Sequence, residues 1–340
     1  MRFYRFGVVL ASVVSVLSTA APVRGEEPDY VPDEVAVKTD QKQPGWHPML
    51  TATGTAAFNH SSNVVGATDG ATWALGLVLN GGLNWLHEAG HEWENLLKWQ
   101  LGYTRTPVLD RFFKSTDALD FTSTYMYRIG ALPWLGPFAS VRLQTPVLAG
   151  YLVKPAAGTL QKVDSAGAAI GADEPFAANE EIDLTQAFAP AVLRESAGVF
   201  AHPLEKKTID LIGKLGAGAW EVFTREGWTV DSDKDGVVTL KQMQDSVQVG
   251  AELELKATGA LAENLSYSAR AALMMPFYNN ADTSLSGIDL LNQEYEFLLG
   301  VKLTGWASLD YAFRALKYPL VVDEWQVSNS LLLSLTASIL

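Results

Sequence analysis

The chain has 340 residues, a formal net charge of −13 and no cysteine, and 48% of its residues are hydrophobic. The acidic balance argues against nucleic-acid binding, because contacts to phosphates need clustered Lys and Arg. Without cysteine there is no disulfide framework and no thiolate chemistry.

Residues 1–25 have the pattern of a secretory signal peptide. Arg2 and Arg5 precede an apolar run from Gly7 to about Val16, and small residues follow at 18–21. The run is too short for a convincing transmembrane helix, which is the alternative interpretation. Residues 26–45 are rich in proline and acidic residues, so we expect a flexible periplasmic tail there.

Apolar and polar residues alternate in many segments after residue 45, most clearly in 246–257, which reads SVQVGAELELKA. Successive side chains of a strand point to opposite faces, so such a strand has one apolar face and one charged face. A charged face does not suit the core of a soluble sandwich, but it suits the lumen of a barrel whose apolar face meets lipid. We therefore predict an all-β fold in which residues 46–340 form one transmembrane antiparallel up-and-down β-barrel of about twelve strands.

The expected strands cover 48–60, 71–85, 92–104, 119–131, 137–149, 186–201, 207–223, 245–260, 264–276, 293–304, 306–317 and 326–340. Short connections are expected at 86–91, 132–136, 202–206, 261–263 and 305, and long ones at 61–70, 105–118, 150–185, 226–244, 277–292 and 318–325. This alternation is typical of outer-membrane barrels, which have short periplasmic turns and longer outside loops. The Ala- and Gly-rich insert 150–185 is expected either on the surface or as a constriction inside the lumen.

Residues 87–91 read HEAGH, which matches the HExxH pattern of zinc proteases. Gly90 and the flanking strand patterns disfavour the helix that such a site needs, and a third ligand is lacking nearby. We therefore expect a polar periplasmic turn. His60 and Ser61 are the best candidates for the catalytic histidine and serine of an outer-membrane lipid hydrolase. However, no residue is placed to orient the histidine. An enzyme is accordingly not expected.

The segment 231–242 reads DSDKDGVVTLKQ and resembles a calcium loop. Gln242 stands where a bidentate Glu belongs, so any calcium site should be weak; an acidic turn without an ion is an equal alternative. Calcium is the one cofactor that the sequence suggests. The candidate ligands are Asp231, Asp233, Asp235, Val237, Thr239 and Gln242.

Acidic and basic residues are nearly balanced on the faces that should point into the lumen. Neighbouring strands are expected to pair opposite signs, such as Glu254 with Arg270 and Glu296 with Arg314. These charges either brace a closed barrel as an ion-pair network or line a selective pore. The candidate pore-lining residues are Glu92, Glu94, Lys98, Arg128, Arg142, Glu252, Glu254, Lys256, Arg270, Glu294, Glu296, Lys302, Asp310 and Arg314.

Loose motifs between Trp46 and Gln144 resemble an uncharacterised family of bacterial outer-membrane barrels that is known only as a domain of unknown function. The residues concerned are Trp73 and Gly76, the segment GGLNW at 81–85, WEN at 93–95 with LGY at 101–103, and KSTD at 114–117. The resemblance implies a barrel fold and no activity. The last strand also resembles the C-terminal signal read by the outer-membrane assembly machinery, except that Leu340 stands where an aromatic residue is usual.

The sequence thus predicts a protein of the Gram-negative outer membrane, in contact with lipid and lipopolysaccharide and inserted by the assembly machinery. The first functional hypothesis is a narrow, porin-like channel for small charged or zwitterionic solutes. The alternative is a non-conducting structural or surface-binding barrel, and a lipid hydrolase is a more distant one.

Overall fold

The structure is a computed structural model that describes residues 43–61, 70–109, 111–281, 283, 285–320 and 322–338. The expected signal peptide, most of the expected tail at 26–45, the β1–β2 connection with Ser62, and the last two residues lie outside the described residues. Among the described residues there is no helix long and apolar enough to cross a membrane.

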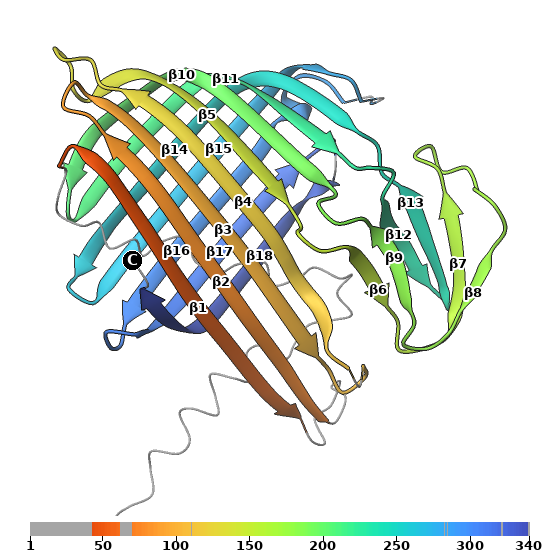
Figure 1. The fold of residues 1–340 in the computed structure, drawn as a ribbon. Helices are drawn as coiled ribbons and strands as arrows, with labels where there is room; N and C mark the ends of the chain where they lie inside the picture. Colours follow the sequence, from red (N-terminus) through yellow and green to blue (C-terminus); the bar gives the residue numbers. More distant parts are fainter. Residues whose placement is uncertain are drawn as a thin grey trace, which may run out of the picture.

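Twelve antiparallel strands of the described chain close into a barrel (Figure 1). Each barrel strand pairs with the barrel strand that precedes it along the chain. The first and last strands, β1 and β18, pair from Thr51↔Ser338 to Thr55↔Ser334 and close the barrel. Closure leaves no unpaired strand edge, which gives every strand a partner on both sides. The strands are β1 (Gly45–Ser61), β2 (Gly70–Leu86), β3 (His91–Arg105), β4 (Phe113–Tyr127), β5 (Leu135–Thr145), β10 (Ala191–Lys206), β11 (Ile209–Phe223), β14 (Ser246–Ala262), β15 (Leu265–Asn279), β16 (Asn292–Lys302), β17 (Ala307–Tyr318) and β18 (Val322–Ser338).

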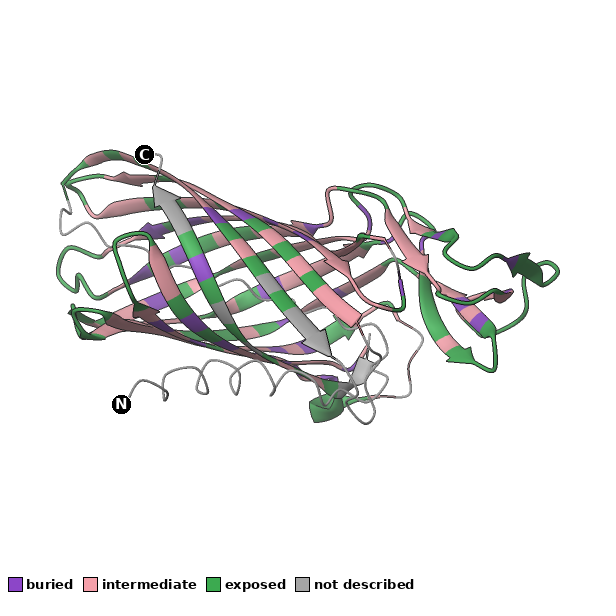
Figure 2. Cartoon of the chain, turned by 90° about the horizontal axis from the view of Figure 1, so that it is seen from below, coloured by how far each residue is buried: buried purple, intermediate pink, exposed green. Residues whose placement is uncertain are grey.

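The predicted faces are present in the barrel wall. Exposed positions alternate with less exposed ones along the strands (Figure 2). On β14, Leu253 and Leu255 are 37% and 47% exposed on the outer face, while the side chain of Glu254 between them is 26% exposed and points inward to its ion-pair partners. The all-β, antiparallel, twelve-stranded barrel expected from the alternation is therefore confirmed.

The two ends of the barrel differ in their connections. One end carries the short turns together with the start of β1 and the end of β18, and we call it the short-turn end. The other end carries the longer connections, including the 3-10 helix Gly287–Leu290 between β15 and β16, and we call it the long-loop end. One expected long connection, 318–325, was wrong: β17 ends at Tyr318 and β18 begins at Val322, because the two strands continue their pairing to Tyr318↔Val322.

Two other predicted boundaries were wrong for local reasons. The expected strand 119–131 lies at Phe113–Tyr127, because an Ile129↔Leu132 bridge folds the chain into a turn directly after it. The turn expected at 202–206 lies at 207–208. Strand β10 continues past Pro203 through a register shift between Ala201 and Leu204, as a β-bulge allows.

The insert 150–185 folds outside the lumen, beyond the long-loop end (Figure 1). It forms β6 (Gly150–Val153), β7 (Gly158–Val163), β8 (Glu174–Phe176) and β9 (Glu181–Thr185), and the connection after β11 adds β12 (Trp228–Lys234) and β13 (Val237–Gln242). These strands make a β12-β13-β7-β8 sheet and a β6-β9 pair, which we call the accessory unit. Its core is apolar and comprises Leu160, Phe176, Ile182, Val238 and Leu240. Of the two positions expected for the insert, on the surface or inside the lumen, the chain adopts the surface position, and the insert is folded there.

Candidate functional site: the charged lumen

The central part of the lumen is lined by an ion-pair network on β11, β14, β15 and β16. Arg270 on β15 contacts Glu254 at 2.8 Å, Glu294 at 2.6 Å and Glu296 at 3.7 Å. Lys214 adds a contact of 3.3 Å to Glu254. These residues meet because the register sets Lys214 opposite Glu254 and Arg270 opposite Glu296, all on the inner face. The expected pair Glu254–Arg270 is present.

The ion-pair network continues onto β17, where the Nε atom of Arg314 lies 3.4 Å from a carboxylate oxygen of Glu296, as expected. On the other side of the barrel, Arg142 of β5 pairs with Asp120 of β4, which also accepts a hydrogen bond of 3.0 Å from Gln144. Glu252 of β14 accepts a 2.6 Å hydrogen bond from the indole of Trp220. Each charge thus has a partner of opposite sign or a hydrogen-bond donor, which offsets the cost of removing it from water.

The ion pair between Arg194 and Glu294 joins strands that are not neighbours in the wall. Arg194 lies on β10 and its partner Glu294 lies on β16, although three strands separate β10 from β16 in the wall. Tyr318 of β17 also donates a hydrogen bond to Glu294. The Glu294 side chain is only 2% exposed and that of Arg194 13%, so this contact is enclosed.

Two aromatic rings hold the crossing guanidinium. The Arg194 guanidinium carbon lies 3.8 Å from the centre of the Trp220 ring and 5.8 Å from that of Tyr318. The two rings, from β11 and β17, meet edge to face with centres 5.7 Å apart. Strands β11 and β17 are not neighbours either, because β14, β15 and β16 lie between them, so side chains from non-adjacent strands touch inside the lumen at this level. A cation over the face of an aromatic ring is attracted by its quadrupole.

A second network lies at the short-turn end. Arg128 pairs with Glu92 at 2.5 Å, and its Nη2 atom lies 3.0 Å from His202 Nδ1. His202 Nε2 lies 3.0 Å from Asp210. His202, Glu205 and Asp210 are the one group of potential metal ligands that lie close together among the described residues. However, Arg128 donates to Nδ1, so the proton on His202 is at Nε2 and is given to Asp210. No ring nitrogen is free for a metal, and the cluster acts as a hydrogen-bond chain.

The remaining predicted lumen residues lie partly at the edges of the central network and partly next to its members. Glu94 is exposed on β3, and Lys302 is exposed at the end of β16. Asp310 is 3% exposed and accepts a 2.8 Å hydrogen bond from Ser308. Lys98 lies opposite Asp120, and Lys256 lies opposite Arg270. His202, Trp220 and Tyr318 belong to the site although the sequence did not indicate them. The alternation on β11 places Trp220 on the same face as Lys214, which is a signal for Trp220.

The calcium-loop residues form a hairpin. Asp235 and Gly236 both have positive φ, 53° and 79°, and connect β12 to β13 as a two-residue turn. Asp233 pairs with Lys154 of the accessory unit. Within the described residues, Asp231, Asp233 and Asp235 do not gather around a common point, and Val237, Thr239 and Gln242 run along β13 away from the turn. The structure therefore does not bring the expected ligands together.

The HExxH segment is a turn, as expected. Gly90 has φ +84° and donates a 3.0 Å hydrogen bond to the carbonyl of His87, and His91 begins β3. The ring of His91 lies 2.6 Å from the hydroxyl of Tyr125. The side chains of His60 and Ser61 lie outside the described residues, so the structure adds nothing on the hydrolase pair.

Comparison with known proteins agrees with the resemblance seen in the sequence. The profile of a protein family of unknown function, DUF3078, matches residues 65–151. No curated protein matches the chain.

Solved structures that resemble the chain are bacterial outer-membrane barrels. The COG4313 outer membrane channel from Pseudomonas putida F1 is 11% identical, with a TM-score of 0.40, over 90% of this chain and 100% of that one. The translocator domain of the autotransporter NalP from Neisseria meningitidis is 8% identical, with a TM-score of 0.37, over 87% and 89% of the two chains. The NanC porin is 10% identical, with a TM-score of 0.36, over 86% and 100%. Likenesses of this degree give no information on solutes.

Proposed function

We propose that the chain is an outer-membrane barrel that forms a narrow passage for small charged or zwitterionic solutes, with Arg194 as its constriction. The outer wall supports the membrane placement. Exposed leucines such as Leu75, Leu97 and Leu215 cover the middle of the wall. A lipid-facing apolar band flanked by aromatic residues is the signature of an outer-membrane barrel.

Aromatic residues gather at both ends of this wall. At the short-turn end, the ring of Trp46 lies 6.2 Å from those of Trp85 and Trp93. At the long-loop end, the rings of Phe58 and Trp73 lie 4.4 Å apart. Amphipathic rings prefer the headgroup level, so these two girdles delimit the proposed membrane span. Lipid and lipopolysaccharide as surroundings, and insertion by the assembly machinery, are part of the same proposal.

The observation that carries the passage hypothesis is the Arg194–Glu294 pair across a lumen of balanced charge. A barrel braced only between neighbouring strands has no need for a contact that spans three intervening strands. Rings of charged side chains select ions and small polar solutes, and one long, movable side chain at the narrowest level can control their passage. The solute would exchange its hydration for contacts with Arg194 on one side and Glu294 on the other.

The test is single-channel conductance of the full chain refolded into a planar lipid bilayer. The wild-type protein should give small, discrete steps, and Arg194→Ala should raise the step size severalfold because the crossing side chain is removed. The matched control is Glu221→Gln on the outer face of β11, which should leave the steps unchanged. Silence of both the wild-type protein and Arg194→Ala, with insertion verified, would reject the passage.

The accessory unit favours one second candidate, a surface-binding barrel. Its own buried core makes it a folded platform at the long-loop end, and not a flexible loop. In that case the lumen would be sealed and the binding residues would lie on this unit. Silent bilayers with Arg194→Ala would favour this candidate.

A further inference from the structure

Glu195 places a carboxylate on the outer wall of the barrel, where lipid-facing side chains are otherwise mostly apolar. Glu195 lies on β10 next to Arg194 and points to the opposite, outer face, where it is exposed. It stands between Val141 of β5 and Ala219 of β11. Among the described residues no hydrogen bond or ion pair reaches this carboxylate.

Glu195 lies between the two aromatic girdles. Along its own wall region, Phe223 of β11 is exposed nearer the long-loop end, and Trp93 and Tyr125 are exposed at the short-turn end. A charged side chain on the lipid face of a barrel is destabilising, and an ionisable residue at membrane depth implies a functional partner. We therefore expect the exposed Glu195 carboxylate to have a partner that is not part of this chain.

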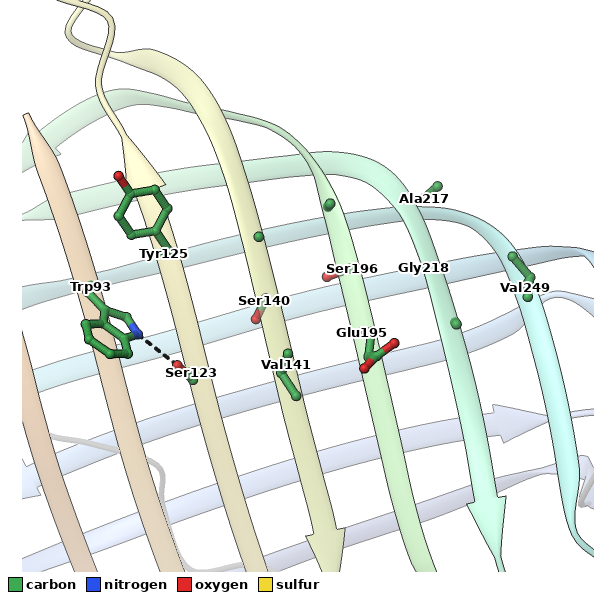
Figure 3. Close-up of a pocket in the computed structure, with 13 residues that line it drawn as sticks. Trp93, Ser123, Tyr125, Ser140, Val141, Glu195, Ser196, Ala217, Gly218 and Val249 are labelled. Atoms are coloured by element: carbon green, nitrogen blue, oxygen red, sulfur yellow. Dashed lines mark hydrogen bonds between the residues drawn. The ribbon is translucent and has the colours of Figure 1, made fainter.

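The wall around Glu195 is hollowed. A shallow, outward-open recess of about 500 Å³ spans β3 to β14 at this position (Figure 3). Its floor is made of small residues, among them Ala139, Ala197 and Ala217, and its margins carry Trp93 and Val249. The size lies in the range of small-molecule sites, which are mostly apolar with a few placed polar groups.

Polar groups beside Glu195 in the recess are already engaged. The Trp93 indole donates a 2.9 Å hydrogen bond to the Ser123 hydroxyl (Figure 3). That hydroxyl in turn donates a 2.8 Å hydrogen bond to Asn95 Oδ1. The hydroxyl of Ser140, whose backbone also lines the recess, points to the inner face, where it shares a 2.8 Å hydrogen bond with Thr124. The Glu195 carboxylate thus has unused acceptor capacity in an otherwise apolar hollow, and it would accept from a cationic donor most strongly.

We propose that this recess binds an amphipathic molecule from the lipid phase, with its apolar body over the small residues and a protonated amine on Glu195. The proposal rests on the membrane placement proposed above. A second copy of the chain is a poorer occupant. No residue lining the recess carries positive charge, and a two-fold contact through this face would bring two Glu195 carboxylates together.

The test measures binding of decylamine, decanol and decanoic acid to the folded full chain in detergent micelles by native mass spectrometry. Wild-type protein should prefer decylamine at least about tenfold over the other two, because a charge-assisted hydrogen bond to a carboxylate is stronger than a neutral one. Glu195→Gln should abolish this preference. The control Glu221→Gln, another outer-face acid on β11 outside the recess, should keep it.

The shape of the recess is tested separately. Ala197→Phe, or Ala217→Leu if the first variant does not fold, should weaken decylamine binding at least about tenfold while Glu195 remains. An amine preference that survives in Glu195→Gln, or undiminished binding in the filled variants, would overturn the proposal. Insertion into vesicles is scored independently by protease protection, so a failed membrane placement is distinguishable from a failed ligand site.

Discussion

At the residue scale, the lumen shows how a membrane barrel can keep many charges in an enclosed space. Arg270 has three acidic partners and Glu294 has two basic ones, so no single contact bears the whole cost of desolvation. Removing one member of such a network is costly because its partners stay enclosed without compensation. Arg270 is the residue where this effect should be largest, since three carboxylates depend on it.

Arg270→Ala should therefore lower the free energy of unfolding by about 3 kcal/mol or more. The measurement is urea unfolding of the full chain in lipid vesicles, followed by tryptophan fluorescence. Lys302→Ala, an exposed charge at the end of β16, is the control and should change stability by less than about 0.5 kcal/mol. Equal midpoints for the two variants would mean that the network does not stabilise the barrel.

At the scale of elements, β10 and β11 approach each other closely through two facing glycines. Gly198 lies opposite Gly216 in the register. A Cβ atom on Gly198 would lie 2.1 Å from the Leu215 carbonyl oxygen and 2.5 Å from the Gly216 Cα. Both obstacles are backbone atoms, so the strands themselves would have to move. The next inward residues on this strand, Ser196 and Phe200, sit beside that contact.

Gly198→Ala should destabilise the barrel by about 1–3 kcal/mol, in line with overpacking of a well-packed contact. Gly54→Ala on β1 is the matched control, because a Cβ atom there meets nothing within 4 Å. It should be neutral or slightly stabilising. The measurement is the temperature at which the folded band disappears on unheated and heated gels. A lower transition for Gly54→Ala than for Gly198→Ala would contradict the packing argument.

At the scale of the whole molecule, the barrel separates two ends with different constructions. The short-turn end carries the Arg128–His202 network, and the long-loop end carries the accessory unit. In the proposed membrane placement, the long-loop end faces the outside of the cell, as is usual for outer-membrane barrels. The native chain has no cysteine, so a single introduced thiol reports on one position without background.

Ala166→Cys in the accessory unit should react with a membrane-impermeant maleimide added to intact cells. Glu88→Cys in the short turn between β2 and β3 should react only after the outer membrane is opened. Both positions are exposed in the structure, so reactivity depends on the side of the membrane alone. Labelling of Glu88→Cys in intact cells would reverse the proposed orientation, and labelling of neither before lysis would place the protein elsewhere.

The sequence by itself determined the local part of this protein: the strand segments, their inward and outward faces, and the pairs Glu254–Arg270 and Glu296–Arg314. These follow from the two-residue period of a strand and from pairing between strands that are close in sequence. The expected insert at 150–185 was also visible, but not its fold, because β7 pairs in parallel with β13, which comes from a different connection.

Only the tertiary structure decided which residues meet across the barrel. Arg194 reaches Glu294, and Trp220 reaches Tyr318, through closure and strand tilt, which depend on all twelve strands together. The parallel pairing of β13 with β7 is likewise a tertiary contact, whereas the hairpin itself follows from the local Asp235–Gly236 turn. Periodicity is a property of one segment, whereas these contacts are properties of the closed wall, and for that reason they could not be predicted residue by residue.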